Sequence, residues 1–226
     1  CEILYPAISE LRKFPKKENL IIFCGKLNSS KGFDIFGKTI LKVLSKFDNW
    51  KAIAIGNEPR EKYQFKHKNF QILDWVKHQK ILNYYSKSSI SVVPSKWQEP
   101  FGRTAMESAA HGCATITSNK GGLTETFDND LILTRLNVSS LFSLINKLIK
   151  SPFLLKKIQK KNYNNVLHKL KDKVDKIDRL KFYFLKPKLN FLRQKTIKIL
   201  HISQFDERND FRLFNLRICI CSMGFY

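Results

Sequence analysis

Two glutamates with seven residues between them bracket the segment 99–107 (EPFGRTAME). Pro100 disfavours helical geometry at Glu99, and Gly102 lets the backbone approach a bound molecule closely. A helix that begins here directs its free N–H groups and its positive end to the same place. Each carboxylate accepts two hydroxyl hydrogen bonds, which suits the diols of a sugar or a ribose. We therefore expect Glu99 and Glu107 to face one cleft.

A simpler interpretation of this segment stays open. Arg103 and Glu107 have the i, i+4 spacing of a helical ion pair, which would leave Glu99 merely exposed. On the same helix, Met106 belongs to the predicted core stripe, whereas Glu107 and His111 lie on the opposite side.

Two lysines, Lys26 and Lys31, lie in the segment 25–32 (GKLNSSKG), which follows an apolar run. The order of residues differs from that of a Walker P-loop. Either lysine taken alone is typical of a solvated loop, but their position directly after a strand favours a ligand site.

Three further segments carry polar or glycine-rich patterns. The segment 74–76 (DWV) offers Trp75, which either stacks on a base or packs, and the segment 121–125 (GGLTE) either passes close to a ligand or is a plain turn. The segment 128–130 (DND) matches a metal-binding pattern, but its composition is typical of a turn.

Apolar runs and helical stripes alternate along the chain. Strands are predicted at 20–25, 50–56, 70–73, 90–94, 114–118 and 131–133, and helices at 32–47, 77–87, 103–111 and over 139–170 with a break at Pro152. Strands that are apolar throughout indicate a parallel sheet covered on both faces. Right-handed crossovers then favour a doubly wound, Rossmann-like α/β fold, followed here by C-terminal helices and a basic tail. Ligands bind at the carboxyl ends of the strands in such a fold, and the segments above follow strands.

Composition narrows the classes of protein. The 226 residues carry a net charge of +22, with 23 Lys and Arg against 13 Asp and Glu in 1–150 and 18 against 6 in 151–226. Such a surface attracts nucleic acid, anionic lipid or phosphorylated substrates, although a Lys-rich solvated surface explains it as well. No uncharged apolar stretch is long enough to predict a membrane-spanning helix. Five cysteines without a paired C-x-x-C favour a reducing, cytoplasmic setting.

The segments 94–107, 25–32 and 121–125 together resemble motifs of the retaining family 4 (group 1) glycosyltransferases of the GT-B fold. The resemblance covers about 20–127 and implies the C-terminal, donor-binding domain. It implies that Glu99 contacts the donor sugar, that Glu107 contacts the ribose, and that Lys26 and Lys31 bind the diphosphate. Lys26 stands where Arg is usual, so a point charge replaces a bidentate fork.

The resemblance also implies the remaining residues of the donor site. These are Gly25, Phe101, Gly102, Arg103, Thr104, Trp75, Val76, Gly121, Gly122 and Glu125. Neither a metal nor another cofactor is expected, because cationic side chains and a helix end stabilise the leaving diphosphate.

The predicted domains are a linker remnant at 1–19, a nucleotide-sugar-binding domain at 20–170, and a basic tail at 171–226. The absence of an initiator Met predicts a fragment that lacks the N-terminal, acceptor-binding domain. A strand-like segment at 195–203 resembles the first strand of such a domain, which suggests that the chain joins two transferases.

The predicted function is transfer of a sugar, with retention, from a nucleoside diphosphate sugar to a glycan or lipid-linked acceptor, in the cytoplasm or on an anionic membrane face. A fragment alone is expected to be inactive. The alternatives are a nucleotide-sugar-binding module without transfer and a basic polyanion-binding domain. Nucleic acid is disfavoured as a partner, because no nucleic-acid-binding motif occurs.

Overall fold

The first apolar run forms strand β1 (Glu18–Cys24), and the amphipathic stripe after it forms helix α1 (Phe33–Lys46). The computed structural model describes residues 13–124 and 130–166. The elements that follow α1 are β2 (Lys51–Ile55), β3 (Phe70–Leu73), α2 (His78–Lys87), β4 (Ser88–Val93), α3 (Arg103–Ala110), β5 (Ala114–Ser118), the short 3-10 helix η1 (Gly122–Thr124), β6 (Ile132–Leu133), α4 (Val138–Lys150) and a helix over Pro152–Val166.

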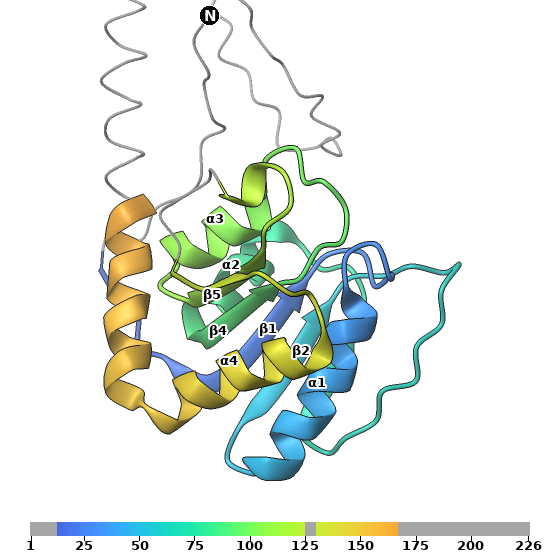
Figure 1. Ribbon diagram of the computed structural model, residues 1–226, viewed down its shortest axis with the longest axis horizontal. Coiled ribbons are helices and arrows are strands. Elements are labelled where there is room, and N and C mark those ends of the chain that lie inside the picture. The colour runs from blue at the N-terminus through green and yellow to red at the C-terminus, as the bar shows by residue number, and fades with distance from the viewer. Residues whose placement is uncertain (1–12, 125–129, 167–226) are drawn as a thin grey trace, which may run out of the picture. The chain divides into compact units, whose positions relative to one another are not determined.

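The strands form one parallel sheet in the order β3-β2-β1-β4-β5-β6 (Figure 1). The direction of winding reverses at β1, since β2 and β3 extend the sheet on one side and β4 to β6 on the other. Ligands in doubly wound sheets bind outside the carboxyl ends of the strands at this reversal. The loops after β1 and β4 are therefore the place where a site is expected.

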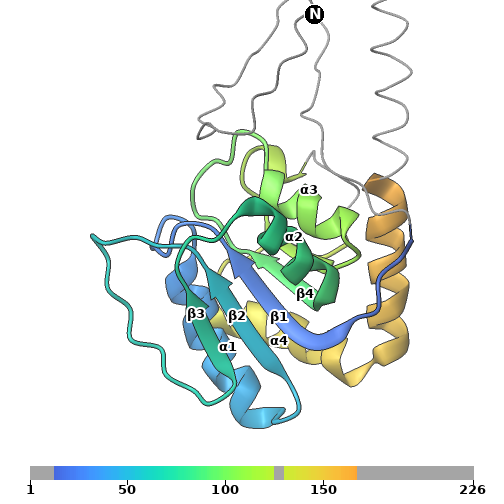
Figure 2. The same ribbon diagram turned by 180° about the vertical axis from the view of Figure 1, so that it is seen from behind.

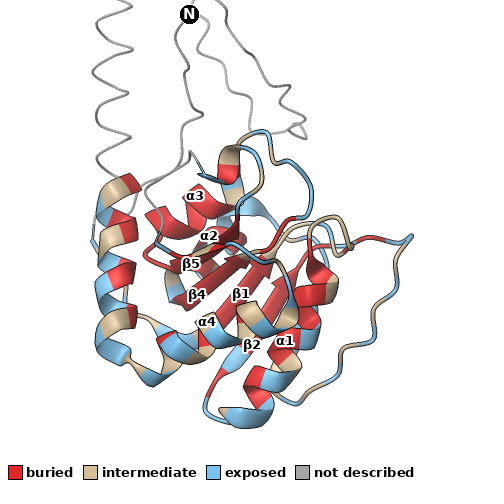
Figure 3. Cartoon of the chain, in the orientation of Figure 1, coloured by how far each residue is buried: buried red, intermediate tan, exposed pale blue. Residues whose placement is uncertain are grey.

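Helices cover both faces of the sheet, with α1 and α4 on one face and α2 and α3 on the other (Figures 1 and 2). Alternation along β1 supplies both cores, because Ile21 and Phe23 belong to the core on the α1 and α4 face, and Ile22 to the core that contains residues of α2. The central strands are buried (Figure 3). These observations confirm the predicted doubly wound α/β fold.

Two strands begin two residues earlier than predicted: β1 begins at Glu18 rather than at Leu20, and β4 begins at Ser88 rather than at Ile90. Ser88 and Ser89 interrupt the apolar pattern yet are buried in the strand. The hydroxyl of Ser88 donates to the carbonyl of Tyr84, and that of Ser89 to the carbonyl of Glu18. Polar side chains that are satisfied in this way tolerate burial.

Pro152 separates α4 from the last described helix, as predicted, and the two helices meet at a bend of 104°. Among the described residues, no individual helix has the length and hydropathy to cross a membrane, and only these two helices taken together pass such a test. The predicted tail at 171–226 with its strand-like segment, most of the linker at 1–19, and Glu125 lie outside the described residues.

Candidate functional site

The loops after β1 and β4 are held together at the reversal of the sheet. Gly32, the N-cap residue of α1, has φ 74°, and a Cβ at this position would lie 1.9 Å from the carbonyl oxygen of Pro94. The backbone N–H groups of Lys96 and Trp97 donate to the carbonyl of Ser30 at 2.9 and 3.1 Å. Only glycine fits at Gly32, and the two loops form one backbone unit.

Lys31 and Glu99 join the same two loops through their side chains. The Nζ atom of Lys31 lies 2.5 Å from Oε1 of Glu99, and the two side chains are 30% and 14% exposed. Residues that are 68 positions apart in the sequence thus meet at the edge of the sheet where the fold predicts a ligand. Glu99 is not the merely exposed residue of the simpler interpretation.

Glu107 lies on α3 and is buried. Its Oε1 accepts a hydrogen bond of 3.1 Å from Nη2 of Arg103, so the predicted helical ion pair is present, and Nε2 of His78 lies 3.2 Å from the same oxygen. His111 is also buried, with Nδ1 2.7 Å from the carbonyl oxygen of Glu107, and burial lowers the pKa of His111. The side of α3 predicted to lie away from the core is covered, because α2 packs against α3.

The surroundings of Glu107 include two neutral side chains at the end of β1 and on α2. The hydroxyl of Tyr85 and the thiol of Cys24 share a hydrogen bond, and both groups interact electrostatically with Glu107. Burial raises the pKa of Cys24 to about 11 and the pKa of Tyr85 well above its ordinary value. Neither group supplies a nucleophile at neutral pH.

Gly121 and Gly122 pack against the backbone of Glu99. The N–H of Gly122 donates to the carbonyl of Glu99 at 2.6 Å, and a Cβ at Gly121 would lie 2.3 Å from that carbonyl oxygen. The glycine pair therefore allows this segment to approach the backbone of Glu99 closely. Gly102, with φ 77°, is the N-cap residue of α3 and lies three residues after Glu99.

The other predicted site residues vary in exposure. Lys26 is exposed and forms no hydrogen bond or ion pair with the described residues, and Gly25 begins the loop with a hydrogen bond to Ile55. Trp75 is 53% exposed, and its ring lies 3.5 Å from the place of a Cβ at Gly56, beside the end of β2. Phe101 and Thr104 are half-buried, Arg103 is exposed, and Val76 packs on the core of the α2 side.

Within the residues that the structure describes, no three His, Cys, Asp or Glu side chains form a group that could hold a metal ion. Asp130, the last residue of the D-x-D pattern, accepts two hydrogen bonds of 2.7 and 2.8 Å from Nζ of Lys161. The other two residues of that pattern lie outside the described residues.

Sequence reasoning missed several residues of this edge, namely Asn28, Glu58, Arg60, Glu61 and His78. Glu58 and Glu61 contact the loop after β1, Arg60 contacts Glu58, and His78 contacts Glu107. A signal for them existed, because they too follow strands, but Asn28 had no role assigned within its segment and the other four residues belong to no motif.

An open parallel sheet with this order, and with polar loops gathered at its reversal, defines the doubly wound class of α/β domains. The family described as "Glycosyl transferases group 1" matches residues 6–196, and the chain belongs to this family. The predicted family is thereby confirmed.

Curated relatives match part of their length. An uncharacterized 42.6 kDa protein of the cps region of Klebsiella pneumoniae is 36% identical over 46% of this chain and 27% of its own. The phosphatidylinositol N-acetylglucosaminyltransferase GPI3 subunit of Saccharomyces cerevisiae is 27% identical over 64% of this chain and 34% of its own. The chain thus spans between about a quarter and a third of these relatives.

Solved structures show the same fold. The C-terminal domain of the group 1 glycosyl transferase LpcC from Francisella tularensis has a TM-score of 0.60 at 24% identity, covering 73% of this chain and 94% of that one. Anabaena HepE, solved with UDP-glucose, has a TM-score of 0.58 at 15% identity, covering 72% of this chain and 49% of that one.

Proposed function

We propose that this chain is the donor-binding part of a retaining glycosyltransferase and that it binds a nucleoside diphosphate sugar. The observation that carries the proposal is the meeting of Lys31 and Glu99 at the reversal of the sheet. A cation and a carboxylate held side by side match the two chemistries of such a donor, which are an anionic diphosphate and a sugar rich in hydroxyls.

The proposed chemistry divides between the two loops. Lys31, Lys26 and the start of α3 neutralise the diphosphate, which stabilises the departing nucleoside diphosphate. Glu99 accepts hydrogen bonds from sugar hydroxyls, and Glu107 accepts them from the ribose. In the whole reaction, the bond from the anomeric carbon to the phosphate oxygen breaks, a bond to the acceptor oxygen forms, and the acceptor releases its proton.

The partners of the whole protein follow from the same proposal. HepE was solved with UDP-glucose, and GPI3 is named as a subunit of an N-acetylglucosaminyltransferase, which supports a nucleotide sugar as donor. We propose a glycan or lipid-linked acceptor, an N-terminal GT-B domain that holds it, and a location in the cytoplasm at an anionic membrane surface. Closure of that domain over the donor would be needed for transfer, so this chain alone is proposed to bind without turnover.

Calorimetric titration with UDP-glucose, GDP-mannose and ADP-glucose tests the proposal. We expect one of them to bind the wild-type chain, and Lys31→Ala to weaken that binding about tenfold or more, because a charge-assisted contact to phosphate is lost. Lys38→Ala is the matched control, since Lys38 is an exposed lysine of α1 and its loss removes the same charge.

Two outcomes oppose the proposal. Equal weakening by Lys31→Ala and Lys38→Ala would show that only net charge matters. Binding of all three sugars and of DNA alike, abolished by salt, would favour the alternative of a basic polyanion-binding domain. Turnover on addition of a separate N-terminal domain would distinguish a transferase from a binding module.

A further inference from the structure

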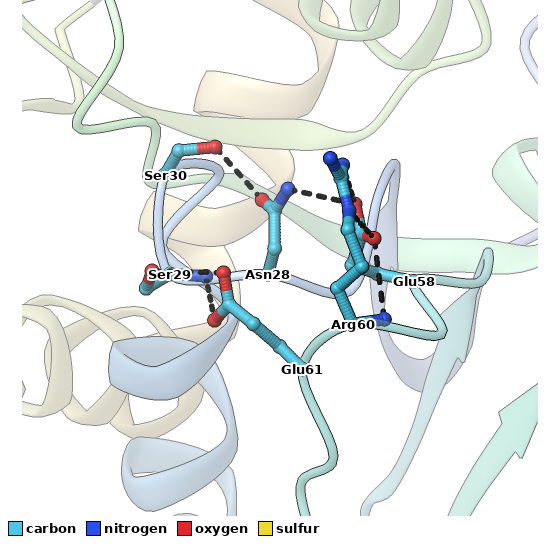
Figure 4. Close-up of polar contacts among 6 residues, drawn as sticks. All are labelled: Asn28, Ser29, Ser30, Glu58, Arg60 and Glu61. Carbon is cyan, nitrogen blue, oxygen red and sulfur yellow. Dashed lines mark hydrogen bonds and ion pairs between the residues drawn. The ribbon is translucent and has the colours of Figure 1, made fainter.

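A polar cluster joins the loop after β1 to residues of the loop after β2 that belong to no predicted motif (Figure 4). Asn28 is 8% exposed, and its Nδ2 donates to Oε2 of Glu58 at 3.3 Å. Its Oδ1 accepts from the backbone N–H of Lys31 at 3.0 Å and from the hydroxyl of Ser30 at 2.9 Å. One buried amide therefore ties the backbone that carries Lys31 to the loop after β2.

Arg60 secures the partner of that amide. Its Nε and Nη2 atoms donate to the two carboxylate oxygens of Glu58 at 2.6 and 2.9 Å. The side chain of Glu58 is only 4% exposed, whereas that of Arg60 is 78% exposed. A buried carboxylate is costly unless it is paired, and the fork of arginine pairs both oxygens. The hydrogen bonds from Arg60 accordingly lower the pKa of Glu58 to about 2.

Glu61 holds the same loop one residue further along. Its carboxylate accepts from the backbone N–H of Ser29 at 2.8 Å and from the hydroxyl of Ser29 at 3.1 Å. The hydroxyl of Tyr63 donates to Glu61 at 2.6 Å, and the ring of Tyr63 packs edge-on against Phe33 at the start of α1. Glu58 and Glu61, both in the loop after β2, thus contact the consecutive residues Asn28 and Ser29.

These contacts concern the binding of a diphosphate because they lead to Lys31, which is proposed to bind it. The chain of hydrogen bonds runs from Arg60 through Glu58 and Asn28 to the backbone of Lys31, whose ammonium contacts Glu99. A carboxylate beside a phosphate site would repel the ligand, and the guanidinium of Arg60 offsets that charge. The arrangement orders the loop before any ligand arrives, which reduces the entropy lost on binding.

We propose that Glu58, Arg60 and Glu61 are positioning residues that hold the loop at 25–32 in the shape that receives the diphosphate of the donor. The inference rests on the proposed function. The three residues act through Asn28 and Ser29 rather than on the substrate. Their removal therefore weakens the binding of groups that contact the loop and leaves contacts to the base unchanged.

The test compares nucleoside diphosphates with monophosphates. UDP, GDP and ADP are titrated into the full chain, followed by the monophosphate of whichever base binds. We expect Arg60→Ala to weaken diphosphate binding about tenfold and monophosphate binding about twofold or less, because only the diphosphate fills the loop. Lys62→Ala is the matched control, since Lys62 is an exposed cation two residues away.

An exchange of donor and acceptor tests the contact itself. Asn28→Asp places a second carboxylate against that of Glu58 and should weaken binding more at neutral than at acidic pH. Combining it with Glu58→Gln restores an amide opposite a carboxylate and should recover most of the lost affinity. Thermal unfolding of each variant shows whether it is folded. If Asn28→Asp does not fold, the Arg60→Ala titration tests the inference, because Arg60 is the exposed member of its pair with Glu58.

The outcomes separate the two proposals. A wild-type chain that binds none of the three nucleotides overturns the proposed function and this inference with it. A wild-type chain that binds, while Arg60→Ala behaves as Lys62→Ala does, overturns the positioning role alone. Equal weakening of diphosphate and monophosphate binding would likewise contradict it, because a general structural defect does not distinguish them.

Discussion

Single residues at this edge of the sheet are held by partners that are distant in the sequence. Glu58 is an example. Its carboxylate accepts hydrogen bonds both from Arg60 and from the side-chain amide of Asn28, which lies in the loop after β1. Glu99 is another, since its side chain meets Lys31 and its backbone carbonyl receives the N–H of Gly122. We expect substitutions of such residues to change stability and the proposed ligand binding together.

Ionisation of Glu58 should make folding sensitive to acid. Hydrogen bonds from Arg60 lower its pKa from 4.5 to about 2 in the folded chain. The ionised carboxylate thus contributes stability above about pH 4.5, and this contribution is lost as the pH falls toward about 2. We expect the free energy of unfolding in urea to fall less steeply over that window in Glu58→Gln than in the wild type.

Glu18→Gln is the control for this experiment, because Glu18 is exposed and its side chain has no hydrogen-bond partner among the described residues. Its pH dependence should match that of the wild type. An identical slope for Glu58→Gln and the wild type would refute the assignment.

At the scale of elements, two helices end at a common cation. Nζ of Lys17, in the segment before β1, donates to the carbonyls of Tyr85 and Ser86 in the last turn of α2, at 2.9 and 3.0 Å, and to that of His111 at the end of α3. A positive charge at the carboxyl end of a helix is favourable, and here it serves two helices. Burial lowers the pKa of Lys17, so the charge is partly desolvated.

Lys17→Met should lower the free energy of unfolding by about 1–3 kcal/mol, because three carbonyls lose a charged donor while the apolar stem is kept. Chemical denaturation followed by circular dichroism measures the change. Lys16→Met, which alters an exposed neighbour, is expected to stay within about 0.5 kcal/mol of the wild type. A similar loss in both variants would mean that Lys17 does not join the helices.

At the scale of the molecule, the net charge of +22 exceeds what a diphosphate site requires. A surface of that charge should attract anionic membranes. Attachment to a membrane would bring the protein close to the proposed lipid-linked acceptor. The proposed binding of a nucleotide sugar should depend less on salt, because hydrogen bonds to neutral hydroxyls contribute to it.

Sedimentation with phosphatidylglycerol vesicles should therefore retain the chain at low salt and release it as NaCl increases. Phosphatidylcholine vesicles are the uncharged control and should retain little at any salt concentration. Retention on both kinds of vesicle, or none on the anionic kind, would argue against the proposed membrane partner.

Much of the architecture could be predicted because its determinants are local. The apolar runs at β1, β2 and β5 indicate strands through their length and composition, the stripe of α1 indicates a helix through its period, and Pro152 indicates a break. A parallel sheet that is buried on both faces and has right-handed crossovers is then compatible with only a few topologies. The family motifs at Glu99 and Lys31 were visible for the same reason, since each lies within one short segment.

Only the tertiary structure decided which of these segments meet and what surrounds them. The strand order brings Lys31 to Glu99 and Asn28 to Glu58, and the packing of α2 on α3 buries Glu107 under His78. These pairings depend on contacts between residues about 30 to 70 positions apart, and no period in the sequence encodes them. The sequence determined the kinds of element and the chemistry in each loop, whereas the sheet determined the partners, because it sets which loops share an edge.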